Sequence, residues 1–242
     1  PLKYDVELGH LFQLEGDDRK AKRKFKDAID DVPNQRQAYI DLANAFVNRE
    51  LHNYAIDLLK RGNRKITSDR AFHMDLASIY AETRQYRKMM EQYLELLDKN
   101  PDYARQIKDE LQIFIEDGNE EKLSTIKNVL LEQSQKRYSN SLYAELLMWY
   151  SIQLKDFDIA LKQAKALDRR FNENGKRIFY LAKVLADNRK YDLAIDAYQY
   201  VINKGEDNSL YLGSLIRLLD VRFDKLTKTG DYDSKDLLAL EG

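Results

Sequence analysis

Along most of this 242-residue chain, apolar residues recur at steps of three and four positions. Such steps place the apolar side chains on one face of an α-helix. Short polar segments interrupt the pattern, for example at Glu15-Gly16-Asp17 and at Glu50-Leu51-His52, and segments of this kind favour turns. The pattern therefore predicts an all-α chain of antiparallel helix pairs, each with a first helix A, a short turn and a second helix B.

The helix pairs repeat with a period of 34 residues. Counted from Leu2, the first unit has characteristic residues at positions 7, 8, 11, 20, 24, 27 and 32, which are Leu8, Gly9, Phe12, Ala21, Phe25, Ala28 and Pro33. Matching residues recur in the units that begin at Arg36 and Arg70. A fixed period of this length is typical of units that stack on one another, so residues 1–103 are predicted to form three regular repeats.

Small residues at position 8 of helix A and position 20 of helix B are important for this arrangement. Without large side chains there, the two helix axes can approach closely and cross at a shallow angle. Large residues at positions 7, 11 and 24 fill the space around the contact and reach the next helix A. Because one pair cannot bury its own apolar face, the units are expected to stack.

The fourth unit, residues 104–140, keeps the two-helix pattern and loses the signature. Leu111 and Leu123 occupy the two small-residue positions, and the unit is three residues longer than its neighbours. We expect a wider helix pair there and a local change of pitch, which divides the array. Two regular repeats follow over residues 141–208.

The last segment, residues 209–242, predicts a terminal helix and the truncated start of a further one. The helix spans about Ser209 to Thr227, and its inner face is predicted to consist of Leu212, Leu215, Ile216 and Leu219. No polar capping helix is evident at either end, although terminal units of a solenoid usually need one to stay soluble. We therefore expect the array to continue at both ends in a longer protein.

These residues make the chain resemble tetratricopeptide repeat proteins over residues 2–208, except in the fourth unit. The stretch from Phe72 to Tyr103, followed by the degenerate unit and by Trp149 to Arg170, is also similar to long repeat proteins of Bacteroidetes bacteria. The resemblance implies a right-handed superhelical solenoid whose concave face, built mainly from helix A, receives peptides or partner helices. It also implies an export signal ahead of the array, which favours the periplasm or cell envelope over the cytoplasm.

Composition narrows the range of partners. The 40 basic and 41 acidic residues give a formal net charge of −1, so no overall field draws the chain to nucleic acid or to an anionic membrane. The absence of Cys excludes disulfides, thiolate nucleophiles and Cys-ligated zinc. No apolar run reaches the roughly 20 residues that span a bilayer, so this segment is not expected to insert into a membrane.

The sequence also lacks the residue patterns of catalytic and metal sites. The three histidines, His10, His52 and His73, fall at different repeat positions, and no pair has the spacing of a zinc motif. His73 stands at a packing position and is predicted to be a core residue. With no Gly-rich phosphate loop either, we predict a noncatalytic chain without a cofactor or metal site.

A basic segment in the first helix B is the feature that most favours nucleic acid. It contains Arg19, Lys20, Lys22, Arg23, Lys24 and Lys26, and such clusters can supply nonspecific phosphate affinity. Acidic residues such as Asp27 and Asp30 interrupt it, and in tetratricopeptide arrays helix B faces solvent on the convex side. A solvated helix face is the better interpretation, with nonspecific nucleic-acid binding as a weaker alternative.

The concave face of helix A is where we expect a partner to bind. Position 9 of successive units gives a line that is polar at its start, aromatic in its middle and basic at its end, and Phe179 stands beside it at position 5. Aromatic and Arg side chains dominate binding hot spots. The candidate partner-binding residues are His10, Asn44, Ser78, Gln112, Trp149, Phe179, Lys183 and Arg217.

Some of these residues have a second interpretation. Trp149, the sole Trp, is equally suited to packing against the fourth unit. Lys183 and Arg217 are suited to an acidic peptide, although cations on such a face also serve solubility alone. A clamp for a C-terminal carboxylate, known from some tetratricopeptide domains, is disfavoured because only Asn44 matches its residues.

The sequence thus predicts a noncatalytic scaffold that binds a peptide or partner protein. The alternative is a structural spacer or self-assembly element of a larger cell-envelope protein, which the uncapped ends of the array suggest. Formation of oligomers is compatible with both.

Overall fold

The computed structural model of the protein describes residues 2–66, 72–137 and 141–229, and every regular element within these residues is helical. The predicted all-α fold is confirmed. The chain forms two compact units, residues 1–129 and 130–242. The further helix predicted at the end of the chain lies outside the described residues.

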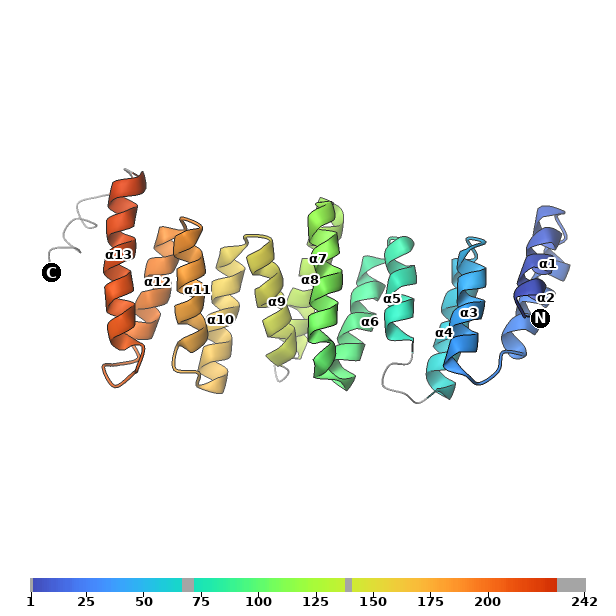
Figure 1. Cartoon of the computed structure of the whole chain (residues 1–242), viewed down its shortest axis with the longest axis horizontal. Coiled ribbons are helices and arrows are strands. Elements are labelled where there is room, and N and C mark those ends of the chain that lie inside the picture. The colour runs from blue at the N-terminus through green and yellow to red at the C-terminus, as the bar shows by residue number, and fades with distance from the viewer. Residues whose placement is uncertain (1, 67–71, 138–140, 230–242) are drawn as a thin grey trace. The chain divides into compact units, whose positions relative to one another are not determined.

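In the first unit, the helices follow one another in pairs (Figure 1). The pairs are α1 (Leu2–Leu14) with α2 (Asp18–Asp30), α3 (Arg36–Val47) with α4 (His52–Lys65), and α5 (His73–Glu82) with α6 (Tyr86–Lys99). A 3-10 turn (Pro101–Tyr103) then leads into α7 (Ala104–Asp117). One helix pair therefore occupies each of the first three 34-residue periods.

The three additional residues of the fourth repeat, residues 104–140, lengthen its second helix. Gly118 ends α7 and has a φ of +68°. It stands at the same repeat position as Gly16 of the first repeat. The additional residues must therefore follow Gly118. There, α8 (Glu120–Lys136) has 17 residues, whereas α2, α4 and α6 have 13, 14 and 14.

The second unit contains two helix pairs and a final helix. These are α9 (Ser141–Gln153) with α10 (Phe157–Phe171), α11 (Lys176–Asp187) with α12 (Tyr191–Ile202), and α13 (Tyr211–Thr229), which lies against α12 (Figure 1). One cluster of buried apolar side chains joins α10, α11, α12 and α13, and it includes Leu161, Leu181, Tyr198 and Leu218. Stacking of successive helices thus buries the core, as a repeat array requires.

Small residues lie where the two helices of a pair approach each other. Gly9 of α1 is buried, and a Cβ atom added to it would lie 2.5 Å from the Phe25 ring of α2. The residues at the same repeat position in α3, α5 and α11 are Ala43, Ala77 and Ala182, and each is at most 3% exposed. The close contact expected from the sequence pattern is therefore present.

The turns between helix A and helix B share one backbone geometry. In the second repeat, the Leu51 N–H bonds to the Phe46 carbonyl at 2.9 Å and the Glu50 N–H bonds to the Val47 carbonyl at 2.8 Å. This pair of bonds is the Schellman motif, which places one residue in the left-handed region. The residue at this repeat position has a positive φ in six repeats, at Gly16, Glu50, Arg84, Gly118, Lys155 and Arg189.

Replacing Glu50, Arg84, Lys155 or Arg189 with Gly is therefore expected to stabilise the protein. In the left-handed region, a Cβ atom crowds the backbone, whereas Gly has no Cβ atom and is not strained there. We therefore expect each single variant to raise the free energy of unfolding by up to about 1 kcal/mol. Urea unfolding followed by circular dichroism measures the gain. Gly16→Ala is the matched control and should lose stability; four Gly variants no more stable than the parent chain would contradict the prediction.

The predicted inner face of α13 is wrong. Leu212, Ile216 and Leu219 are 71%, 62% and 48% exposed, and Leu215 is partly buried, whereas the buried side chains are Ser214, Leu218 and Val221. At the equivalent positions of α11, the apolar side chains are covered by the helix B that follows, α12. Because α13 packs against the helix that precedes it, it buries its other face.

A buried carboxylate fixes the connection between α10, α11 and α12. Asp168 of α10 is fully buried and accepts hydrogen bonds from the Gly175 N–H at 2.5 Å and the Tyr200 hydroxyl at 2.9 Å. It also forms an ion pair with the Lys204 ammonium at 2.5 Å. Burial acts to raise the pKa of Asp168, but the three donors outweigh it and lower the pKa below its ordinary value.

Candidate partner-binding surface

The eight candidate residues lie on successive A helices, namely α1, α3, α5, α7, α9, α11 and α13. None of them is fully buried, so each has some surface available to a partner. Four are exposed and four are partly buried; the exposed ones are Asn44, Ser78, Lys183 and Arg217, and the partly buried ones are His10, Gln112, Trp149 and Phe179. Each of the two units carries four of the eight.

In the first unit, the candidate residues form a polar, uncharged line. Asn44 and Ser78 are exposed, and the Gln112 amide donates to Glu116 at 3.2 Å. The His10 Nδ1 atom is buried and has no hydrogen-bond partner among the described residues. Charges on these helices and on the turn after α3 are paired between repeats, as in Arg49 with Glu7 and Arg36 with Asp75.

In the second unit, Phe179 lies at the centre of an aromatic cluster. Its ring makes T-shaped contacts with the rings of Tyr180 and Tyr198, each at a centroid distance of 5.8 Å. A Cβ atom added to Gly213 of α13 would lie 3.7 Å from the same ring. Phe179 therefore reaches from α11 to α13 while keeping part of its surface exposed.

Two cations lie beside this cluster. Lys183 follows Phe179 by one helical turn and is exposed. Arg217 of α13 is exposed, with its guanidinium 3.5 Å from Asp220. Burial raises the pKa of Tyr198, and the positive charge of Arg217 acts to lower it.

Sequence reasoning missed Tyr180, which is 59% exposed. A signal for it existed, because the first three repeats have an acidic residue at this position, in Glu7, Asp41 and Asp75. An exposed aromatic residue at a position where these three repeats have a partly buried acid suggests a contact with a partner. We call Phe179, Tyr180, Lys183 and Arg217 the α11–α13 patch.

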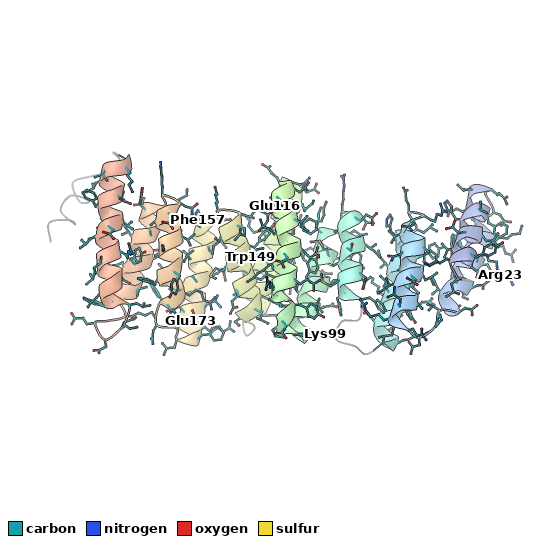
Figure 2. The ribbon with its side chains drawn as sticks, viewed as in Figure 1. Arg23, Lys99, Glu116, Trp149, Phe157 and Glu173 are labelled. Atoms are coloured by element: carbon teal, nitrogen blue, oxygen red, sulfur yellow. The ribbon has the colours of Figure 1, made fainter. Side chains whose placement is uncertain are left out.

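Trp149 lies on α9 (Figure 2) and is partly buried. Its ring is 6.4 Å from that of Tyr150, in a tilted arrangement. Tyr150 itself is fully buried. Trp149 thus lies beside a buried aromatic residue and keeps part of its own surface exposed.

The three histidines lie in different environments. His73 is buried; its Nδ1 is 3.1 Å from the side-chain amide oxygen Oε1 of Gln92 and its Nε2 is 2.9 Å from the Lys99 ammonium. Burial and the Lys99 charge lower the pKa of His73, which favours the neutral ring. The prediction that His73 is a core residue is confirmed.

His52 lines a cavity of about 430 Å³ at the A-to-B turns of the first unit, together with Gln13, Leu51, Tyr54 and Thr83. This cavity lies at the edge of the unit and contains none of the candidate residues. Within the described part of the chain, no group of three or more His, Asp or Glu residues is arranged to hold a metal ion. No described helix is long and apolar enough to cross a membrane.

The basic side chains of α2 lie on its outer face. Arg19, Lys22, Arg23 and Lys26 are exposed, and Figure 2 shows Arg23 near the N-terminal end of the chain. The others are paired with acids, since Lys20 is 2.8 Å from Asp17 and Lys24 is 3.2 Å from Asp5. The buried face of the same helix is apolar, which is the usual arrangement of a helix with one solvated face.

No protein-family model matches the chain, and no curated protein matches it. Among solved structures, the chain is similar to the C-terminal part of a tetratricopeptide repeat protein from Cytophaga hutchinsonii. The two sequences are 15% identical, the match covers 98% of this chain and 95% of the Cytophaga chain, and the TM-score is 0.36. A tetratricopeptide repeat protein from Parabacteroides merdae has 13% identity over 99% and 97% of the two chains, with a TM-score of 0.34.

YrrB, described as a tetratricopeptide repeat protein with an unusual peptide-binding site, has 14% identity over 79% of this chain and 97% of its own, with a TM-score of 0.35. The helical-repeat architecture follows from features of the chain itself, which are the 34-residue period, the helix pairs and the buried small residues between paired helices. With these features, the chain has the all-α architecture of a tetratricopeptide repeat protein.

Proposed function

We propose that this protein is a noncatalytic interaction scaffold that binds a peptide or partner protein on its A helices. The observation that supports the proposal most is the α11–α13 patch. There, an exposed Tyr180 and a partly buried Phe179 lie beside two exposed cations, Lys183 and Arg217. Aromatic side chains offer a large contact area at low entropic cost, and Arg and aromatic residues dominate binding energy at interfaces.

The chemistry of the patch favours an acidic segment with at least one apolar side chain. Lys183 and Arg217 are suited to carboxylates, and the aromatic rings are suited to an apolar group between them. The nearby acid Asp220 is already held by Arg217 at 3.5 Å, an exposed contact that a ligand carboxylate can replace at little cost. The polar line of the first unit offers no comparable group of aromatic and cationic residues.

Selection from a random peptide library is a direct test, since the partner is not identified in advance. We expect the protein to enrich acidic peptides that contain an aromatic or aliphatic residue. Tyr180→Ala should weaken binding of an enriched peptide by roughly 5- to 30-fold. Lys183→Ala should weaken it by a smaller factor that decreases further as salt is added, because exposed charges are screened.

Lys162→Ala is the matched control, because Lys162 is an exposed cation on the B helix α10. It should leave peptide affinity unchanged. Enriched peptides without acidic residues, or equal binding by the Tyr180→Ala and parent chains, would contradict the proposed surface.

The alternative function, self-assembly or structural spacing, also has an observation in its favour. α13 exposes several large apolar side chains, including Leu212, Ile216 and Phe223. Solvated apolar residues in such a group are typical of an interaction surface.

A further inference from the structure

Gly213 of α13 lacks the packing reason that the other helical glycines have. The glycines within the described helices are Gly9, Gly62 and Gly213. A Cβ atom added to Gly9 or Gly62 would lie 2.5 or 2.4 Å from a buried aromatic ring, so a larger residue would clash there. At Gly213 the nearest atoms would lie at 3.7 Å, which is ordinary contact. A helical Gly that packing does not require lowers helix stability and suggests another role.

Gly213 also interrupts a line of side chains that runs across the A helices. Position 5 of successive repeats holds Val6, Ile40, Met74, Lys108, Glu145, Phe179 and Gly213. Among the described residues, only Cε2 and Cζ of the Phe179 ring would lie within 4 Å of a Cβ atom added to Gly213. The space that a side chain at residue 213 would occupy is therefore open and bordered by the tip of one aromatic ring. We call this space the Gly213 gap.

The face of α13 that carries the gap is accessible. One period earlier, the residues that correspond to Gly213 and Arg217 are Phe179 and Lys183 of α11. Phe179 is partly exposed and Lys183 is exposed, although α12 follows α11 and packs against it. A helix that follows an A helix thus leaves these positions uncovered. Gly213 itself is partly exposed and Arg217 is exposed.

On each side of the gap, a cation lies one helical turn further along. Lys183 follows Phe179 by four residues, and Arg217 follows Gly213 by four residues. α11 and α13 run in the same direction, because two connections reverse the chain between them (Figure 1). With a rise of about 1.5 Å per residue, both cations lie about 6 Å from the gap along the helix axes. The surface therefore has an apolar level and a cationic level.

We propose that Gly213 sets the specificity of the α11–α13 patch by admitting one apolar side chain of an extended, acidic peptide. This inference rests on the proposed peptide-binding function and specifies the ligand of that same surface. The incoming side chain lies against the tip of the Phe179 ring, with the Tyr180 ring 5.8 Å from that of Phe179. A flexible aliphatic side chain such as Leu or Met suits a contact with an aromatic ring and a helix backbone.

The two levels also predict the spacing of residues in the ligand. In an extended peptide, every second side chain points to the same side, and such neighbours are about 6.6 Å apart. This separation matches the distance between the apolar and the cationic level. The ligand is therefore expected to have an acidic residue two positions from its apolar residue, with the carboxylate between Lys183 and Arg217.

A side chain added at residue 213 should block this ligand without disrupting the fold. Leu favours the helix and finds only the Phe179 ring nearby, so Gly213→Leu should fold and fill the gap itself. We expect it to weaken binding of a matching peptide at least about tenfold, because the apolar side chain of the ligand is no longer buried. Ala166→Leu, which adds the same side chain at an exposed small residue of α10, is the matched control and should leave binding unchanged.

Four display libraries test the spacing. Each contains one Leu and one Glu separated by zero, one, two or three residues, and all other positions are random among Gly, Ser, Thr, Asn and Gln. The full chain should retain the library with one intervening residue roughly tenfold more than the others, and Gly213→Leu should abolish this preference. Equal retention of all four libraries, or a preference for three intervening residues as in a helical ligand, would overturn the inference.

Two further measurements separate the possible failures. If no library is retained more than a library with Ser in place of both Leu and Glu, the proposed function and this inference fail together. If the Leu and Glu peptides bind the parent and Gly213→Leu chains equally well, this inference alone fails. Urea unfolding followed by Trp149 fluorescence verifies that Gly213→Leu is folded. Should it not fold, Gly213→Ala provides the same test, with an expected loss of affinity of roughly threefold.

Discussion

Replacing Asp168 with Ala is expected to lower the free energy of unfolding of the second unit by about 2–4 kcal/mol. The change leaves the Gly175 N–H and the Tyr200 hydroxyl without their acceptor. It also removes the counterion of Lys204, although that side chain is 23% exposed and can still reach water. The loss of one carboxylate thus disrupts the connection between α10, α11 and α12.

Trp149 provides the measurement, because it is the sole Trp and lies in the second unit. Its fluorescence during urea unfolding reports on that unit alone. Asp196→Ala is the matched control, since it removes an exposed ion pair with Lys165 at 2.7 Å between the same two helices, α10 and α12. Asp196→Ala should lower the free energy of unfolding by less than about 1 kcal/mol. Equal decreases for Asp168→Ala and Asp196→Ala would contradict the importance of the buried network.

The effect of Asp168→Ala should also depend on pH. The folded state holds the pKa of Asp168 below its ordinary value, so the carboxylate stabilises the fold at any pH above the unfolded value of about 3.9. This contribution is lost as the pH falls through the folded pKa. The difference in stability between the parent chain and Asp168→Ala is therefore expected to be largest near neutral pH and to shrink in acid.

Replacing Gly62 with Ala is expected to destabilise the first unit by about 1–3 kcal/mol. A Cβ atom at this position of α4 would lie 2.4 Å from the Phe72 ring and 2.8 Å from the Tyr39 ring. Both rings are fully buried and contact each other at a centroid distance of 5.4 Å, so neither can move without opening the core. The steric cost exceeds the preference of a helix for Ala over Gly.

The same Gly-to-Ala substitution at Gly213 of α13 should raise the free energy of unfolding instead of lowering it. A Cβ atom added to Gly213 would meet the Phe179 ring at 3.7 Å, which is ordinary van der Waals contact. Gly213→Ala is therefore expected to gain about 0.5–1 kcal/mol from helix propensity. Circular dichroism follows the helices of both units and Trp149 fluorescence the second unit alone, so a circular dichroism transition without a fluorescence change reports on the first unit. A Gly62→Ala chain as stable as the parent would contradict the close contact.

The candidate surface was only partly predictable from the sequence. Repeat positions correctly located Lys183 and Arg217 as exposed residues of A helices. They did not reveal that Phe179 reaches Gly213 of α13 or that Tyr180 is exposed beside it. Contacts between successive repeats depend on side-chain direction and on the distance between helices, which a position count does not contain.

The final helix shows the same limit. The repeat register assigned Leu212, Ile216 and Leu219 to an inner face, because a following helix B covers these positions in the regular units. These three residues do stand at the repeat positions that are buried in α11. They are exposed because α13 packs against α12, the helix that precedes it. Whether an apolar residue is buried depends on its neighbour as well as on its own helix.

By itself, the sequence determined the helix pairs, their period, the small residues at their contacts and the turns between them. These features are local, since they follow from the 3.6-residue helical period and from steric limits within one repeat. The tertiary structure alone decided at which residue the two compact units divide, the network around Asp168 and the exposed apolar face of α13. Those features join residues that are far apart in the chain, such as Asp168 and Lys204, or depend on which helix is adjacent, so no pattern within one repeat specifies them.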